Sequence, residues 1–167
     1  AGEYGVWRRR GGAWLPTNTG LFGGSAAYVS DMAVSPAYAA DGTLFTTQAS
    51  SVSVGTALFK STDRAATWRY VKSAGYISQI ELSPDFPTDP RAFMVADQRV
   101  LTSTDAGETW TAQPVWTFAQ TARLLAVSPN FATNQTVYVV GNQAYRSTDA
   151  GATWQPASAP PPITESS

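Results

Sequence analysis

The chain has 167 residues, of which 43% are apolar and only 14% are charged, and its formal net charge is −1. This length allows one ordinary domain with a hydrophobic core, and the near-neutral charge gives no electrostatic reason to expect a nucleic acid or an anionic membrane as partner. The sequence contains neither cysteine nor histidine, which excludes disulfide bonds, thiol chemistry and any general base or zinc ligand that depends on histidine.

The first predicted element is a β-hairpin within residues 1–16. Strands are expected over Tyr4–Arg8 and Ala13–Leu15. The segment between them, Arg10-Gly11-Gly12, is typical of a tight turn because glycine adopts a positive φ without steric cost. Residues 17–27 are rich in Gly, Ser and Thr and predict a loop.

Three similar blocks, each with Ser-Pro near its start, follow along the chain. Their prolines lie at positions 36, 84 and 129. Each block predicts a strand on either side of a short loop, because proline cannot donate a hydrogen bond within a sheet and a later Asp or Asn can cap the loop. The expected strands are 28–34, 76–82 and 124–127 before the blocks and 43–47, 92–96 and 136–140 after them, and the capping residues are Asp41, Asp89 and Asn134.

An octet with the pattern Ser-x-Asp-x-Gly-x-Thr-Trp alternates with these blocks. The copies at 103–110 and 147–154 match every fixed position, whereas the copy at 61–68 has alanine where the others have glycine. Each octet predicts a turn in which the Asp carboxylate accepts backbone N–H groups one or two residues on, the Gly takes a positive φ and the Trp ring is buried. We expect the first copy to be strained or differently shaped. The residues assigned to this structural role are Ser61, Asp63, Trp68, Ser103, Asp105, Gly107, Trp110, Ser147, Asp149, Gly151 and Trp154.

The spacing of the repeats predicts the architecture. The octet tryptophans lie at positions 68, 110 and 154, a period typical of a four-stranded propeller blade. The predicted fold is therefore all-β: a β-propeller of four-stranded antiparallel blades, of which this chain carries about three and a half. The partial propeller covers 1–154, with an outer hairpin at 1–16 and blades at about 28–71, 76–113 and 121–157, and the Pro- and Ser-rich residues 155–167 predict a linker or a disordered tail.

The octet resembles the Asp-box, also called the BNR repeat. This motif occurs in sialidases, the sortilin/Vps10 ectodomain, xyloglucanases, photosystem II assembly factors resembling Ycf48, and large secreted bacterial repeat proteins. The resemblance implies a fold-forming hairpin on the rim of a propeller, usually far from any active site. It also implies an extracellular or bacterial cell-surface location.

The acidic side chains offer few candidates for catalysis. The octet aspartates are expected to satisfy their turns, since each holds the same repeat position. The loop acids Asp41, Asp85 and Asp89 are better suited to Asx turns than to calcium, because no loop offers more than two carboxylates. Glu81 is the only acid predicted in an inner strand and has no apparent partner for glycoside hydrolysis. We therefore predict no catalytic residue, cofactor or metal ion.

Three other features are candidates for interaction or modification. Arg8, Arg9 and Arg10 can bind a carboxylate or a phosphate, although alternating strand geometry prevents all three from facing one way. Trp116 lies in a linking stretch that can face a groove or an interface. Asn134-Gln135-Thr136 matches the acceptor sequence for an N-linked glycan.

The open blade count predicts a protein partner. Three and a half blades leave strand edges uncovered, and such edges pair with other chains. We expect the ring to be completed by self-association, where two copies bring the count to seven, or by a partner chain. No stretch approaches about 20 apolar residues, so no membrane span is predicted.

The sequence thus favours a non-catalytic, secreted or cell-surface propeller that serves as a structural or protein-interaction module. One alternative is a fragment of a glycoside hydrolase of the sialidase or xyloglucanase type. Another is an assembly factor like Ycf48, which would bind its partner through Arg8–Arg10.

Overall fold

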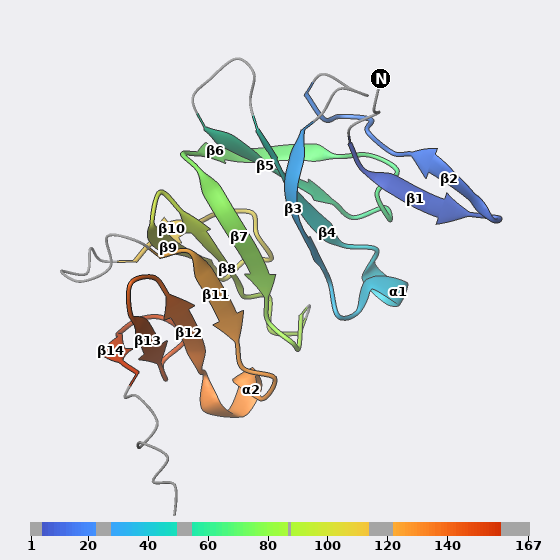
Figure 1. The fold of residues 1–167 in the computed structure, drawn as a ribbon. Coiled ribbons are helices and arrows are strands. Elements are labelled where there is room, and N and C mark those ends of the chain that lie inside the picture. The colour runs from blue at the N-terminus through green and yellow to red at the C-terminus, as the bar shows by residue number, and fades with distance from the viewer. Residues whose placement is uncertain (1–4, 23–27, 50–54, 87, 114–121, 158–167) are drawn as a thin grey trace, which may run out of the picture.

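The computed structural model describes residues 5–22, 28–49, 55–86, 88–113 and 122–157. The strands within these ranges form one two-stranded and three four-stranded antiparallel sheets (Figure 1). This arrangement confirms the predicted all-β fold of four-stranded blades. Among the described residues, no helix is long and apolar enough to cross a membrane.

The two-stranded sheet, here called the front hairpin, consists of β1 (Trp7–Arg10) and β2 (Ala13–Pro16). The turn at Gly11 and Gly12 has φ of 58° and 88°. Because this turn follows Arg10 directly, the ladder pairs Arg10 with Ala13 and extends to Trp7. The predicted strand at 4–8 was therefore placed too close to the N-terminus.

The three four-stranded sheets run in chain order from the inner to the outer strand. Sheet 1 consists of β3 (Val29–Val34), β4 (Leu44–Ala49), β5 (Thr56–Ser61) and β6 (Arg69–Ala74). Sheet 2 consists of β7 (Ile77–Leu82), β8 (Ala92–Ala96), β9 (Arg99–Ser103) and β10 (Thr111–Ala112). Sheet 3 consists of β11 (Leu124–Val127), β12 (Val137–Val140), β13 (Ala144–Ser147) and β14 (Gln155–Pro156).

Two of the Ser-Pro loops contain a single helical turn, α1 (Tyr38–Asp41) and α2 (Phe131–Asn134), where the sequence predicted only a loop. The capping role expected for the loop acid or amide is confirmed in these two. The bonds run from the Thr43 N–H to Asp41 Oδ1 (2.8 Å) and from the Thr136 N–H to Asn134 Oδ1 (3.0 Å). The carboxylate of Asp89 instead lies 3.6 Å from Nε of Arg91.

The inner strands β3, β7 and β11 lie side by side, and the sheets fan outward from them (Figure 1). A side chain of each preceding strand bonds to the backbone of the next. Asp31 Oδ2 accepts the Ile80 N–H (2.8 Å). Gln79 accepts the Leu125 N–H (2.7 Å) and donates to the Leu125 carbonyl (2.9 Å). These contacts hold neighbouring inner strands in register.

The hydrophobic core is divided among the spaces between successive sheets. Each space is filled by side chains from both of its walls, as expected when amphipathic sheets stack. Between sheets 1 and 2 these include Phe45, Leu58, Ile80, Met94 and Leu101. Between sheets 2 and 3 they include Phe93, Val95, Val100, Leu125, Val137 and Tyr145. Between the front hairpin and sheet 1 they include Val6, Leu21, Leu44, Phe59, Ala65 and Trp68.

Candidate functional site

The three octets form closely similar turns, which we call the octet turns. In each, the serine Oγ accepts the backbone N–H four residues on, at 2.9, 2.8 and 2.7 Å in chain order. The same hydroxyl donates to the aspartate Oδ1. The aspartate also accepts both the backbone N–H and the hydroxyl of the threonine four residues on. The prediction that it would accept N–H groups one or two residues on was wrong, because its side chain spans the turn.

The first octet turn keeps this geometry despite lacking glycine. Ala65 has a φ of 63°, beside 81° for Gly107 and 89° for Gly151. The predicted difference in shape is therefore absent, although an alanine at positive φ carries strain. The copies differ instead at the tryptophan, since Trp68 Nε1 donates to the Thr17 carbonyl (2.7 Å), whereas Trp110 and Trp154 bond to the glycine carbonyl of their own turns.

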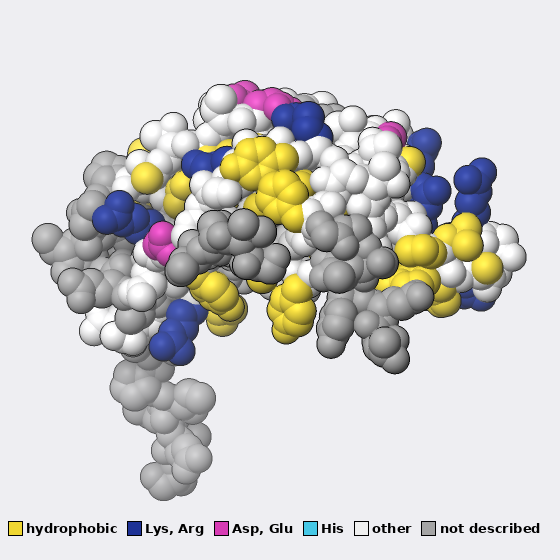
Figure 2. All heavy atoms as spheres, turned by 90° about the horizontal axis from the view of Figure 1, so that it is seen from above, with side chains coloured by type: hydrophobic (Ala, Val, Ile, Leu, Met, Phe, Trp, Pro, Cys, Tyr) yellow, Lys and Arg dark blue, Asp and Glu magenta, His cyan; other side chains and the backbone are white. Residues whose placement is uncertain are grey.

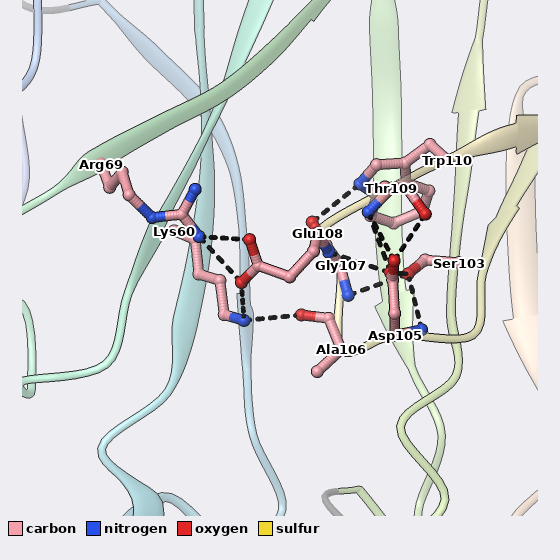
Figure 3. Close-up of polar contacts among 9 residues, drawn as sticks. All are labelled: Lys60, Arg69, Ser103, Asp105, Ala106, Gly107, Glu108, Thr109 and Trp110. Atoms are coloured by element: carbon pink, nitrogen blue, oxygen red, sulfur yellow. Dashed lines mark hydrogen bonds and ion pairs between the residues drawn. The ribbon is translucent and has the colours of Figure 1, made fainter.

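The second octet turn also joins sheet 2 to sheet 1 (Figure 3). Lys60 Nζ, which is buried, donates to the Ala106 carbonyl (2.8 Å) and to Glu108 Oε1 (2.7 Å). Arg69 pairs with the other oxygen of Glu108 (2.6 Å). The hydrogen bond from Lys60 lowers the pKa of Glu108 against the opposing effect of burial, and the bond from Arg69 lowers it further. Glu108 is thus held ionised between two cations of the preceding sheet.

The octet carboxylates are held ionised by their turns. Hydrogen bonds from the Thr67 side chain and backbone lower the pKa of Asp63 to about 2. Burial acts to raise the pKa of Asp105, but bonds from Thr109 outweigh it and bring the value to about 2. The same balance lowers the pKa of Asp149. Groups with such low pKa values are poor proton donors at neutral pH.

We predict that the free energy of unfolding falls as the pH is lowered from about 4 towards about 2. The carboxylates have lower pKa values folded than unfolded, so their contribution is complete above the unfolded value of 3.8 and is lost on protonation of the folded form. Urea denaturation at a series of pH values measures this. The Asp105→Asn variant should be less stable than wild type at pH 6, and the difference should be much smaller at pH 2, near the folded pKa of Asp105. An unchanged difference at pH 2 would contradict the prediction.

A second candidate site lies at the end of the propeller where the inner strands begin. Tyr28 and Tyr76 immediately precede β3 and β7, and they are 61% and 69% exposed. Asp97 Oδ1 accepts the Tyr76 N–H (2.7 Å), and Arg123 precedes β11. We call these four residues the tyrosine end. Figure 2, which is viewed from above, shows hydrophobic side chains gathered in the middle of this face.

Two adjoining hollows open at the tyrosine end. One, of about 610 Å³, is lined by Tyr28, Tyr76 and Asp97, among others. The other, of about 430 Å³, is lined by Tyr76, Asp97, Gln98 and Arg123, among others. Tyr76 and Asp97 therefore line both hollows. This site was not predicted from the sequence, although the two tyrosines stand at the same distance before Pro36 and Pro84.

Two acids lie on the inner strands, so the prediction that Glu81 is the only one was wrong. Asp31 is in β3, and its carboxylate accepts a hydrogen bond from the Ile80 N–H. Burial raises the pKa of Glu81, a hydrogen bond from Gln79 opposes the shift, and the charge of Asp31 adds to it. The acidic pair of Asp31 and Glu81 includes none of the octet aspartates and none of Arg8–Arg10.

The other predicted interaction residues are dispersed. Arg8 is half-buried and its guanidinium donates to the Arg64 carbonyl of the first octet turn, while Arg9 and Arg10 are exposed. Trp116 lies outside the described residues. The Asn134 amide nitrogen donates to Ser128 Oγ (2.9 Å), and an N-linked glycan would leave it a single N–H for this bond.

The stacked sheets define a β-propeller. No family model and no curated protein matches the chain. Solved structures do, including YCF48 bound to D1 peptide (TM-score 0.58, 18% identity, 78% of this chain and 40% of that one). A GH74 xyloglucanase from Xanthomonas campestris matches with a TM-score of 0.68 and 16% identity over 95% of this chain and 28% of that one. A nidogen/laminin complex matches with a TM-score of 0.60 and 11% identity over 90% and 56%.

These likenesses concern the fold, because the sequence identities are low. In each case this chain spans clearly less than two thirds of the length of the similar chain. The neighbours include a glycoside hydrolase as well as chains seen with a peptide or in a protein complex. The propeller fold alone therefore does not distinguish these functions.

Proposed function

We propose that this chain is a non-catalytic propeller module that binds a protein partner at the tyrosine end. The observation that carries the proposal is the pair of exposed tyrosines, Tyr28 and Tyr76, beside a hollow of about 610 Å³. Tyrosine is favoured at protein interfaces because its ring offers a large apolar contact and its hydroxyl a polar one. Asp97 and Arg123 add one charge of each sign.

The proposal draws support from the similar folds and from the octets. One similar chain is bound to a peptide, and another belongs to the nidogen/laminin complex. In this proposal the octets are Asp-boxes. The protein then acts outside the cell or at the cell surface. The alternative of a glycoside hydrolase rests on Glu81 and Asp31. We favour binding because Asp31 is used in joining β3 to β7, where the next sheet has Gln79 in the same role.

The test is peptide selection on the intact chain. A displayed library of random peptides is selected on wild type, and the enriched peptides are measured by calorimetry. We expect the Tyr28→Ser, Tyr76→Ser double variant to weaken binding by tenfold or more, on the order of the loss for one interface tyrosine. Tyr70→Ser, an exposed tyrosine in β6 of sheet 1 that lines neither hollow, is the matched control and should bind like wild type.

Two outcomes would contradict the proposal. Peptides that bind equally well to the double variant would remove the tyrosine end as the site. Release of sugar from xyloglucan or from a sialoside by wild type, lost in Glu81→Gln, would favour the hydrolase instead.

A further inference from the structure

The face of sheet 3 that points away from sheet 2 is uncovered among the described residues, unlike the same face of the sheets before it. Phe45, Phe93 and Tyr138 hold the same place, each paired with the residue before an octet serine. Phe45 and Phe93 are 0% and 1% exposed, whereas Tyr138 is 39% exposed. Val140, two residues further along β12, is 42% exposed.

The inner strand of sheet 3 shows the same change. Asp31 of β3 and Gln79 of β7 lie three residues before the end of their strands, where each bonds to the backbone of the next inner strand. The corresponding residue of β11 is Leu124, which is 61% exposed. Leu124 pairs with Val140 across the sheet, so Leu124, Val140 and Tyr138 form one exposed apolar patch, and such a patch marks an interaction site.

On the sheets whose corresponding face is covered, an octet turn of the next sheet packs against that face. A Cβ placed on Gly107 would lie 2.5 Å from the ring of Phe45, so the second octet turn rests directly on that ring. Lys60 bonds to the carbonyl of the residue before this glycine. The guanidinium of Arg8 makes the corresponding contact with the carbonyl of Arg64 in the first octet turn. Arg146, exposed on sheet 3, stands in the place of Lys60.

We propose that this face of sheet 3 is a docking surface for a further propeller blade, whose octet turn carries an acidic residue directly after its glycine. The glycine rests on Tyr138, and Arg146 donates to the carbonyl before the glycine and pairs with the acid, as Lys60 does with Glu108. A groove of about 210 Å³, lined by Tyr138, Arg146, Gln155, Pro156 and Ala157, lies at this place.

A second copy of this chain does not fit the surface as well. Its acid-bearing octet turn is already seated, because Lys60 and Arg69 hold Glu108. Its first octet turn is covered by the front hairpin through Arg8 and Thr17. Two copies would also combine six full blades with two outer hairpins rather than close seven blades, since neither copy supplies inner strands to the front hairpin in the described residues.

The test extends the full chain after Ser167 with a second copy of residues 76–113, the blade that contains Glu108. Each blade of a repeat array is stabilised by its neighbour. We therefore expect the extended chain to unfold in one transition at a midpoint raised by about 5 °C or more. Arg146→Glu should abolish the rise, and Glu→Lys at the added copy of Glu108 should restore it. An extension with residues 28–75, which keeps the whole of β6 and whose octet has Ala66 in place of the acid, should give a smaller rise.

Several results would overturn the proposal. An added blade that stays unfolded, or that leaves the midpoint unchanged, would show that the face does not accept a blade. A midpoint rise that Arg146→Glu does not affect would remove the contact proposed. If the unextended chain sediments as a dimer at micromolar concentration and Arg146→Glu makes it monomeric, the occupant is a second copy. None of these readouts depends on Tyr28 or Tyr76.

Discussion

Replacing Gly107 by alanine should lower the free energy of unfolding by about 3–5 kcal/mol, which combines backbone strain and overpacking. The φ of Gly107 is 81°, in the region that favours glycine. A Cβ there would lie 2.5 Å from two ring atoms of Phe45. Phe45 is fully buried between sheets 1 and 2, so its ring cannot move without disturbing the core.

Gly151→Ala is the matched control. Gly151 has a φ of 89°, but the nearest atom to an added Cβ is 3.5 Å away, on Trp154, which is ordinary contact. We expect a loss of about 1–2 kcal/mol from backbone strain alone. Ala65, which occurs naturally at the same place in the first octet turn, indicates that the fold tolerates such strain.

Urea denaturation followed by tryptophan fluorescence measures both variants. A Phe45→Leu background should reduce the cost of Gly107→Ala, because the smaller side chain leaves room for the new methyl group. Equal losses for the two glycine variants would show that the contact with Phe45 is unimportant.

Phe93→Ala should destabilise the protein by about 3–5 kcal/mol, the usual cost of deleting a fully buried aromatic ring. Phe93 is 1% exposed and lies between sheets 2 and 3. Its ring meets that of Phe131 edge-on, with centroids 5.5 Å apart. Removing it leaves a cavity between two blades.

The control is Tyr138→Ala, at the equivalent place on sheet 3. Tyr138 is 39% exposed, so we expect a change of less than about 0.5 kcal/mol, typical of surface substitutions. Chemical denaturation under identical conditions compares the two. A large loss for Tyr138→Ala would show that the face of sheet 3 is already covered in the isolated chain, and so would also count against the docking surface.

Local contacts explain why much of the fold could be predicted. An octet turn is closed by bonds among residues no more than four apart, such as those of Ser103, Asp105 and Thr109. The octet pattern is therefore visible in the sequence, and the spacing between its copies indicates a propeller blade. The range of the aspartate contacts was missed because an Asx turn was assumed in place of a carboxylate that spans four residues.

The candidate sites were less accessible to sequence reasoning. The tyrosine end brings together Tyr28, Tyr76, Asp97 and Arg123, which are far apart in the chain. The role of Asp31 depends on the backbone of β7, almost fifty residues away. An alignment of the repeats could have shown that Tyr28 and Tyr76 are equivalent, but it could not have predicted the hollow beside them.

The amino-acid sequence by itself determined the strand order, the octet turns and the number of blades, because each depends on contacts within one repeat. Only the tertiary structure decided which of the equivalent side chains are covered. Phe45, Phe93 and Tyr138 occupy one place in the repeat, yet two are buried and one is exposed. The physical reason is that burial here depends on the next sheet in the stack, which is held by contacts between distant residues such as Lys60 with Glu108 and Asp31 with Ile80.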